Sequence, residues 1–255
     1  MVVHLSSELR QCEFRFYEEL NDFLQPECRK RSFTHAFDGT PSVKDRIESL
    51  GVPHTEVDMI LVDSHSVPFA HKLHWGERVA VYPMFERFEL AEANRLRPQP
   101  LREPAFVLDV HLGRLAAYLR LLGFDCLYRN DFNDDELLAI SRAEHRTVLT
   151  RDTGLLKRAA LTHGAFLHAT DPRRQLREVL DRFQLESRIA PFTRCARCND
   201  AVESIPGEQA AALVPARVAR LQSEFSRCRS CGQVYWPGSH LMRLRQRLAE
   251  AGITI

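Results

Sequence analysis

No stretch of this chain approaches the roughly 20 consecutive apolar residues that a membrane-spanning helix needs. Residues 1–15 also lack the apolar core of a secretory signal peptide. Glycine-rich phosphate loops are missing too, since the chain contains neither G-x-G-x-x-G nor G-x-x-x-x-G-K-S/T. We therefore expect a cytoplasmic protein that neither enters a membrane nor uses a nucleotide cofactor.

Lysine is rare, because 31 of the 35 basic residues are arginine. The planar guanidinium of arginine matches a phosphate group well, although codon bias in a GC-rich genome would produce the same excess. The charge distribution is more informative. Residues 1–101 carry 12 basic and 16 acidic side chains, whereas residues 102–255 carry 23 and 18. The second part of the chain is therefore the part suited to bind a polyanion.

Four of the seven cysteines form two Cys-x-x-Cys pairs, Cys195/Cys198 and Cys228/Cys231. Without a secretory signal, this spacing favours a metal over disulfides. Each pair can present two thiolates to one tetrahedral zinc ion, and four thiolates close its coordination shell. The 29 residues between the pairs exceed the usual zinc-ribbon spacing. We expect an inserted helix around 215–224 to occupy them, and a zinc ion whose role is structural.

Residues 1–90 read as a small domain built on a β-sheet. Alternation and short apolar runs predict its strands, at 12–17, 31–37, 57–63, 67–68 and 78–83. A helix is expected to begin at Pro41-Ser42 and to end at Gly51. This order resembles the β-grasp, ubiquitin-like fold, and most closely its small sulfur carriers. Those carriers end in Gly-Gly, whereas this chain continues through Met84-Phe85-Glu86, so a docking role toward a protein partner remains.

A change of pattern follows the first domain. Residues 90–104 are polar and contain three prolines, and we interpret 91–103 as a linker. Over 104–190, short apolar runs predict strands that alternate with helices. The predicted strands are at 105–108, 125–128, 146–150 and 165–168. Alternation of this kind implies βαβ units and a parallel sheet.

Aspartates follow several of these strands. Asp109 and Asp152 occupy the same place in two βα units, where a buried strand ends and a helix begins. Asp171 repeats this less clearly after the fourth strand, and Asp134 and Asp135 begin the second helix, at the same edge of the sheet. Any one of them alone would be explained as a helix N-cap. Several together would repel one another unless a cation neutralised them.

Oxygen ligands without histidine or cysteine favour Mg²⁺ or Mn²⁺. A site of this kind activates water and stabilises the leaving oxygen of a phosphodiester. The pattern of strand-end acids beside a basic surface therefore favours a metal-dependent phosphodiester hydrolase.

The second part of the chain, over roughly 103–250, resembles the Mut7-C RNase family, PIN-like nucleases fused to a C-terminal zinc ribbon. The resemblance rests on three motifs: Asp109-x2-Leu112-Gly113-Arg114-Leu115-Ala116, Asp134-Asp135-Glu136-Leu137-Leu138 and Leu149-Thr150-Arg151-Asp152. It implies an α/β fold with a PIN-like parallel sheet flanked by helices over 104–190 and a zinc ribbon with a final helix over 191–255. Residues 1–90 are similar to the ubiquitin-like domain that precedes the nuclease in some members.

The resemblance also implies a ribonuclease whose catalytic acids are Asp109, Asp152 and one of Asp134 or Asp135, with Asp171 as a further candidate. It would bind Mg²⁺ or Mn²⁺ through Asp109 and Asp152, and its zinc through the four cysteines.

Arginines flank these acids. Arg114, Arg120 and Arg151 are candidates to hold the RNA backbone, while a solvated helix face is the alternative for the first two. The run Tyr235-Trp236-Pro237-Gly238-Ser239-His240 resembles the tail motif of the family. His240 either contacts the scissile phosphate or caps the final helix, expected over 241–249.

Two functions from different classes follow from these observations. The leading hypothesis is a Mg²⁺- or Mn²⁺-dependent ribonuclease that hydrolyses RNA. The alternative is a non-catalytic RNA- or ribosome-binding adaptor, in which the zinc ribbon and the β-grasp domain bind and the acids only cap helices. A phosphatase that uses Asp109 as nucleophile is less favoured, because His111 occupies the position where such enzymes carry a second aspartate.

Overall fold

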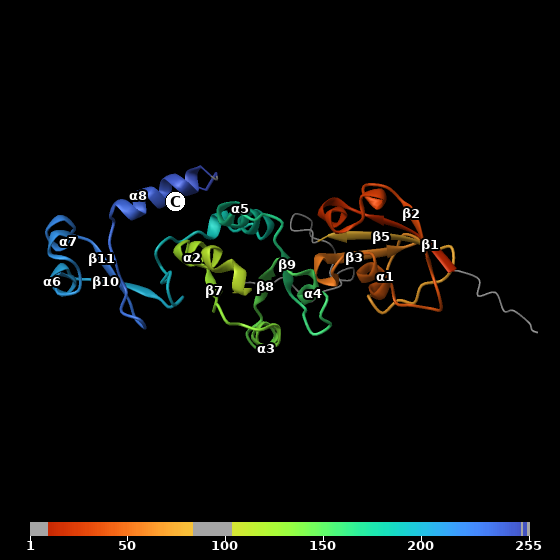
Figure 1. The fold of residues 1–255 in the computed structure, drawn as a ribbon, viewed down its shortest axis with the longest axis horizontal. Coiled ribbons are helices and arrows are strands. Elements are labelled where there is room, and N and C mark those ends of the chain that lie inside the picture. Colours follow the sequence, from red (N-terminus) through yellow and green to blue (C-terminus); the bar gives the residue numbers. More distant parts are fainter. Residues whose placement is uncertain (1–9, 84–103, 251, 254–255) are drawn as a thin grey trace, which may run out of the picture. The chain divides into compact units, whose positions relative to one another are not determined.

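The computed structural model describes residues 10–83, 104–250 and 252–253 (Figure 1). These residues form two compact units. The first contains residues 10–83 together with residues 152–165, and the second contains the other described residues. The expected linker over 91–103 lies outside the described residues.

A five-stranded mixed sheet forms the centre of the first unit, with its strands in the order β2-β1-β5-β3-β4. The strands are β1 (Arg10–Phe16), β2 (Phe33–Phe37), β3 (Val57–Val62), β4 (His65–Ser66) and β5 (Arg78–Pro83). The strands β1 and β5 pair in parallel, and the other neighbours pair antiparallel. This arrangement confirms the predicted β-grasp class. The short strand β4 replaces the expected strand at 67–68, where Pro68 has no N–H for a ladder hydrogen bond.

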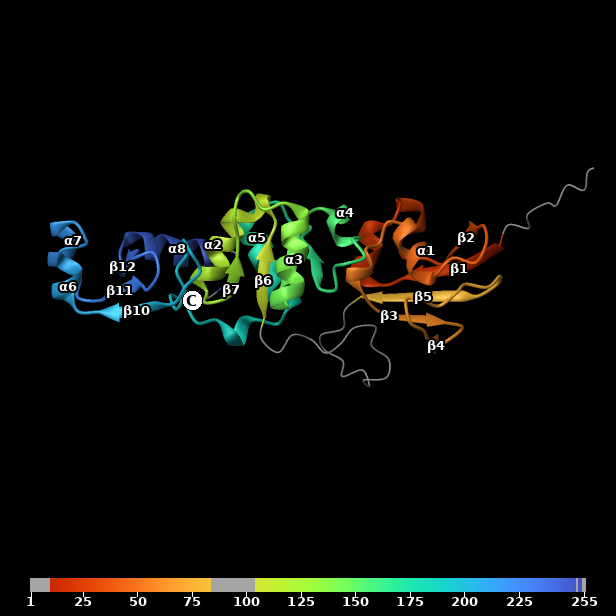
Figure 2. The same ribbon diagram turned by 90° about the horizontal axis from the view of Figure 1, so that it is seen from below.

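Helix α1 (Val43–Ser49) covers one face of this sheet (Figure 2). It begins with a capping box, in which the Asp45 N–H donates to Ser42 Oγ and the Ser42 N–H donates to the Asp45 carboxylate. Its side chains Val43 and Ile47, one turn apart, are fully buried against the sheet. Short 3₁₀ helices complete the unit, at Glu18–Phe23, Pro26–Cys28 and His54–Glu56.

The predicted parallel sheet is also found, with the strand order β7-β6-β8-β9. Its strands are β6 (Ala105–Leu108), β7 (Asp125–Leu127), β8 (Thr147–Thr150) and β9 (Gly164–Phe166). The strand β6 pairs in parallel with both β7 and β8. Every residue of β8 is buried, as expected for a parallel strand that is covered on both faces.

Helices alternate with these strands as expected. They are α2 (Gly113–Leu121), α3 (Asp134–Glu144), α4 (Thr153–Leu156) and α5 (Pro172–Arg182). A 3₁₀ turn over Val110–Leu112 precedes α2, so this helix begins two residues later than the expected His111. Helix α2 packs beside α5 (Figure 1), with Leu115 and Leu119 of α2 fully buried. A 3₁₀ turn over Glu186–Arg188 follows α5.

The last part of the second unit is a small antiparallel sheet with three helices. Its strands are β10 (Val202–Ile205), β11 (Phe225–Cys228) and β12 (Val234–Tyr235), in sequential order. Its helices are α6 (Gly207–Ala211), α7 (Ala216–Leu221) and α8 (Ser239–Ala249). The helix expected around 215–224 is α7, and α6 is an additional one. Both lie between the two cysteine pairs, and they contribute Ala210 and Val218 to the small apolar cluster that contains Phe225.

Among the described helices, none has the length and apolar character that a crossing of the lipid bilayer demands.

Candidate functional site

Asp109 directly follows β6 and is tied to the neighbouring strand β8. Its N–H donates to Leu149 O at 3.1 Å, and its carboxylate oxygen Oδ2 accepts a hydrogen bond from Thr150 Oγ1 at 2.7 Å. Although Asp109 occupies the N-cap position of the following 3₁₀ turn, its side chain makes no capping hydrogen bond. The helix-cap explanation therefore does not account for this aspartate.

Asp152 follows β8, the strand beside β6. Its carboxylate oxygen Oδ1 accepts a hydrogen bond from the Gly154 N–H at 2.7 Å and so caps α4. The side chain is exposed. A carboxylate has about four acceptor positions, so capping does not exclude a second role.

The acids at the start of α3 divide into two groups. Asn133 caps the helix, and the Glu136 carboxylate completes the capping box by accepting from the Asn133 N–H at 3.0 Å. Glu136 also pairs with Arg129 at 2.9 Å. Asp134 and Asp135 are exposed in the first helical turn. The structure thus assigns a structural role to Glu136 and keeps Asp134 and Asp135 as the two candidate acids of this helix.

Asp171 acts as the N-cap of α5. Its Oδ1 accepts hydrogen bonds from the backbone N–H groups of Arg173 and Arg174, at 3.0 and 3.2 Å, and the Arg173 guanidinium lies 3.4 Å away. These hydrogen bonds lower the pKa of Asp171, and the bond from the Arg174 N–H has the largest effect. The structure therefore explains Asp171 as a helix cap.

The predicted acids do not form a tight ligand cluster of their own. Within the described part of the chain, the one group of three or more His, Cys, Asp or Glu residues with ligand atoms close together is the set of four cysteines. Mg²⁺, however, usually keeps several of its waters and is bound through one or two carboxylates. A Mg²⁺ site therefore needs fewer protein ligands than a closed cluster supplies.

The three predicted arginines differ in their surroundings. Arg114 is exposed in the first turn of α2. Arg151 is exposed between β8 and Asp152, and its guanidinium donates to the carbonyl oxygens of His168 and Ala169. These contacts hold the Arg151 side chain beside the edge where β8 ends.

Arg120 requires a correction. Its side chain is only 5% exposed, and its guanidinium donates to three backbone carbonyls, Cys126 O at 2.8 Å, Ala196 O at 3.3 Å and Arg197 O at 2.9 Å. A buried guanidinium with these partners is not available to a phosphate group. The burial could have been expected from the sequence, because position 120 lies four residues after Ala116, on the apolar face of the helix.

We expect Arg120→Met to lower the free energy of unfolding by about 2–4 kcal/mol, because it leaves buried carbonyls without their donor. Urea unfolding followed by circular dichroism measures this change. The matched control is Arg114→Met on the exposed side of the same helix, which should stay within about 0.5 kcal/mol of the unaltered protein. Equal stability of the two variants would contradict the assigned role of Arg120.

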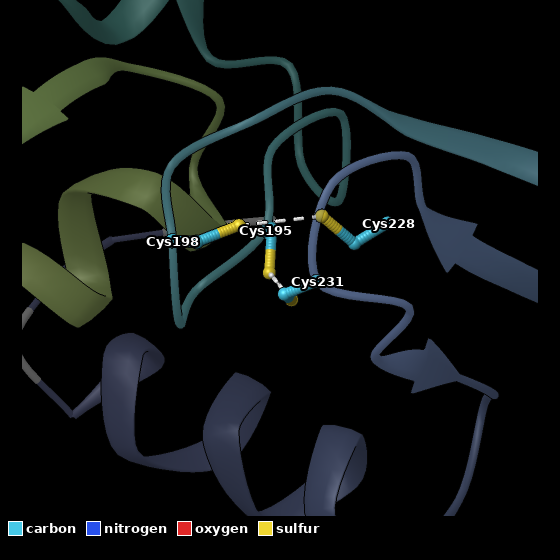
Figure 3. Close-up of side chains that lie close together, drawn as sticks. All are labelled: Cys195, Cys198, Cys228 and Cys231. Atoms are coloured by element: carbon cyan, nitrogen blue, oxygen red, sulfur yellow. Dashed lines mark hydrogen bonds between the residues drawn. The ribbon is translucent and has the colours of Figure 1, made fainter.

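The four predicted metal-binding cysteines come together (Figure 3). All four sulfur atoms lie within 4.8 Å of one another, with Cys195 Sγ 3.6 Å from Cys231 Sγ and Cys198 Sγ 3.3 Å from Cys228 Sγ. Four thiolates at about 2.3 Å from a tetrahedral zinc ion would be separated by about 3.8 Å. The cluster is thus consistent with a structural zinc site.

Tyr235 supports this cluster from β12. Its hydroxyl lies 3.1 Å from Cys195 Sγ and accepts a hydrogen bond from the Ala196 N–H at 3.1 Å. Burial opposes ionisation of Cys195, but the hydrogen bonds from Tyr235 and from the N–H groups of Cys198 and Arg197 lower the pKa of Cys195 to about 6. At Cys195 the thiolate, which is the form that binds zinc, is therefore favoured, whereas burial and the neighbouring thiols raise the pKa of Cys198 to about 12. No pattern in the sequence indicates this role of Tyr235.

Asn199 directly follows the pair Cys195/Cys198, whose loop we call the first cysteine knuckle. It joins the cluster to β7. Its Oδ1 accepts from the Cys126 N–H at 2.9 Å, and its Nδ2 donates to Asp125 Oδ1 at 2.8 Å. Asp125 also pairs with Arg146 at 2.6 Å. Burial raises the pKa of Asp125, but the hydrogen bonds from Arg146 and Asn199 outweigh it and lower the pKa below the usual value of about 4. The ion pair of Asp125 and Arg146 therefore stabilises the fold above about pH 4, the usual pKa of an aspartate. This contribution is lost as the pH falls through the lowered pKa of Asp125.

His240 lies in the first turn of α8, and its side chain is outside the described part of the structure. Gly238 is the N-cap residue of this helix. Both proposed roles of His240, contact with the phosphate and capping of the helix, therefore stay predictions.

Comparison with known families identifies two regions. A family model described as the Mut7-C RNAse domain matches residues 104–248, and a model described as Mut7-C ubiquitin matches residues 9–89. The first match alone covers more than half of the chain. No curated protein and no solved structure matches the chain.

Proposed function

Because this chain belongs to the Mut7-C RNase domain family, we propose that it is a metal-dependent ribonuclease that hydrolyses RNA phosphodiester bonds. Asp109, Asp152 and one of Asp134 or Asp135 are proposed to hold a catalytic Mg²⁺ or Mn²⁺. The four cysteines are proposed to hold a zinc ion with a structural role only, because four thiolates leave no open coordination position.

The observation that carries this proposal is the environment of Asp109. Its carboxylate makes no cap hydrogen bond to the helix that follows and accepts instead from the Thr150 hydroxyl of the adjacent strand. The Asp109 carboxylate is held at the carboxyl end of a parallel strand, which is where α/β enzymes place groups that act on a ligand. The hydroxyl fixes the orientation of one oxygen and leaves the other oxygen for a cation.

Asp152 supports the same proposal. The strands β6 and β8 are neighbours and run in parallel, so the residues that follow them leave the sheet at the same edge. Oxygen ligands alone, with no nitrogen or sulfur donor, match the preference of Mg²⁺ and Mn²⁺. A bound divalent ion would supply a water of lowered pKa and neutralise charge on the leaving oxygen.

The residues of the chain would then share the work as follows. The carboxylates of Asp109 and Asp152 hold the cation, and Thr150 keeps Asp109 in one orientation. Arg151 and Arg114, both exposed, are proposed to hold phosphates of the RNA backbone on either side of the cleaved bond. The larger share of basic residues in the second part of the chain supports this path for the RNA.

A metal-dependence experiment tests the proposal. Protein cleared of loosely bound divalent ions by gel filtration is incubated with mixed cellular RNA, and the RNA is analysed by electrophoresis. We expect added Mn²⁺ or Mg²⁺ to raise the cleavage rate by about a hundredfold or more, since a metal contributes several kcal/mol to the transition state. Ca²⁺, which is larger and less strict in geometry, should substitute poorly.

The zinc content must be measured in the same samples. If zinc stays bound while cleavage follows the added Mn²⁺, the two metals act at separate sites. RNA binding without cleavage under every metal condition would instead favour the adaptor function.

A further inference from the structure

The segment that follows Asp152 is anchored by residues of the ubiquitin-like domain. Helix α4 and the loop after it, up to Ala165, belong to the same compact unit as residues 10–83. Hydrogen bonds join the two parts of this unit, and three of them use residues at or next to the 3₁₀ turn His54–Glu56 or at the end of α1.

The first two hydrogen bonds come from adjacent residues. His54 Nε2 lies 2.9 Å from Leu161 O, and Thr55 Oγ1 donates to Leu156 O at 3.3 Å. The third runs in the other direction, since Lys157 Nζ donates to the backbone oxygen of Glu48 at 2.9 Å. Together they fix both ends of the segment between Leu156 and Leu161.

The first two of these contacts are buried. Thr55 and Leu156 are completely buried, Leu161 is almost so, and His54 is 8% exposed. A buried carbonyl that loses its donor carries a desolvation penalty, so water does not easily replace the contacts. The other ring nitrogen of His54, Nδ1, lies 2.6 Å from Glu48 Oε1, and the Phe69 ring meets the imidazole edge-on. The imidazole is thereby held in one orientation.

We call the contacts of His54 and Thr55 with Leu161 and Leu156 the anchor. A single helical turn separates this anchor from Asp152. Leu156, which accepts from Thr55, is the last residue of α4, and its N–H donates to Asp152 O at 3.4 Å. The Asp152 carboxylate caps the same turn. The loop behind it is tightly packed, because a Cβ at Gly164 would lie 2.6 Å from the Leu156 side chain. The turn can therefore hardly shift without breaking the anchor.

We infer that the ubiquitin-like domain positions the catalytic acid Asp152 through His54 and Thr55. The domain thereby contributes to catalysis by the nuclease. The inference rests on the proposed function, in which Asp152 holds the metal. His54 and Thr55 are positioning residues and touch no substrate. A catalytic group that moves by about 1 Å loses roughly a hundredfold in rate, and this gives the anchor its importance.

Two pairs of variants of the full chain test the inference. Thr55→Val removes the donor and keeps the shape, whereas Thr55→Ser keeps the hydroxyl. His54→Ala removes the ring, whereas His54→Gln retains a nitrogen that can reach Leu161 O. The control His65→Ala removes an exposed histidine of the same domain, whose Nδ1 lies 2.9 Å from the Asp63 carbonyl oxygen.

The first measurement is amide hydrogen exchange of the peptide covering residues 153–165, which needs no RNA. We expect exchange to become about tenfold faster in Thr55→Val and His54→Ala, while the strands of the first unit keep their protection. Thr55→Ser, His54→Gln and His65→Ala should stay close to the unaltered protein. Unchanged exchange in both Thr55→Val and His54→Ala would overturn the anchor.

The second measurement separates kcat from KM in RNA cleavage at several Mn²⁺ concentrations. We expect Thr55→Val and His54→Ala to lower kcat by tenfold to a hundredfold, to leave KM unchanged and to require more Mn²⁺ for half of the maximal rate. A normal kcat in both variants despite faster exchange would overturn the positioning role and leave the proposed function intact. If the unaltered protein cleaves no RNA, the proposed function fails together with the catalytic role of the anchor, and the exchange data still decide whether the anchor exists.

Discussion

Asp109→Asn should abolish most RNA cleavage while the fold and the affinity for RNA stay the same. Asparagine has nearly the same shape and retains an oxygen that can accept from Thr150, but it lacks the negative charge that a cation needs. Loss of about 4 kcal/mol of transition-state stabilisation corresponds to a rate roughly a thousandfold lower. The measurement is single-turnover cleavage at saturating Mn²⁺, with RNA affinity determined in parallel by fluorescence anisotropy.

The matched control for this variant is Asp171→Asn. Asp171 also follows a strand and precedes a helix, but its carboxylate caps α5 through the N–H groups of Arg173 and Arg174. We expect this variant to keep nearly all of its stability, because asparagine is as good an N-cap as aspartate, and to cleave RNA at the normal rate. Normal cleavage by Asp109→Asn, or an equal loss in both variants, would contradict the assignment of Asp109.

Cys228→Ala should release the zinc and unfold the C-terminal lobe that contains β10, β11 and β12. Cys228 is buried, and its Sγ lies 3.3 Å from Cys198 Sγ. The lobe has only a small apolar core around Ala210, Phe225 and Val234. The free energy of binding to a structural zinc site, on the order of 10 kcal/mol, is then lost from folding. Metal analysis and thermal unfolding measure the two effects.

Cys28→Ala is the control for the cysteine variant, since Cys28 is half-buried in the first unit and far in sequence from the knuckles. It should keep one zinc ion per chain and nearly the same unfolding temperature. Full zinc content in Cys228→Ala would show that the ion is bound elsewhere.

The positions of the strands and helices and the cysteine cluster followed from local patterns in the sequence. The period of the apolar residues decides between strand and helix, and the spacing of Cys195/Cys198 and Cys228/Cys231 limits what they can bind. These features depend on residues close together in the chain. The same is true of the capping box at Ser42, where the start of the helix was predicted from Pro41-Ser42.

The roles of individual polar side chains did not follow in the same way. Asp109 and Asp171 look alike in the sequence, and only the structure separates the aspartate that caps its helix from the one that does not. Arg120 was assigned to the RNA backbone, although its partners are carbonyls up to 77 positions away in the sequence. The partnership of residues 152–165 with His54 and Thr55 likewise depends on contacts across about 100 positions.

The bonds made by Arg120 and Asn199 also have a consequence for solubility. The strand β7 is the outermost strand at one side of its sheet. In this strand the Cys126 N–H donates to Asn199, and the Cys126 C=O accepts from the Arg120 guanidinium. An uncovered strand edge is a template on which other chains add by backbone pairing. Protein that loses its zinc, and with it the order of the Asn199 knuckle, should therefore aggregate through β7 at concentrations where the zinc-loaded protein stays dispersed.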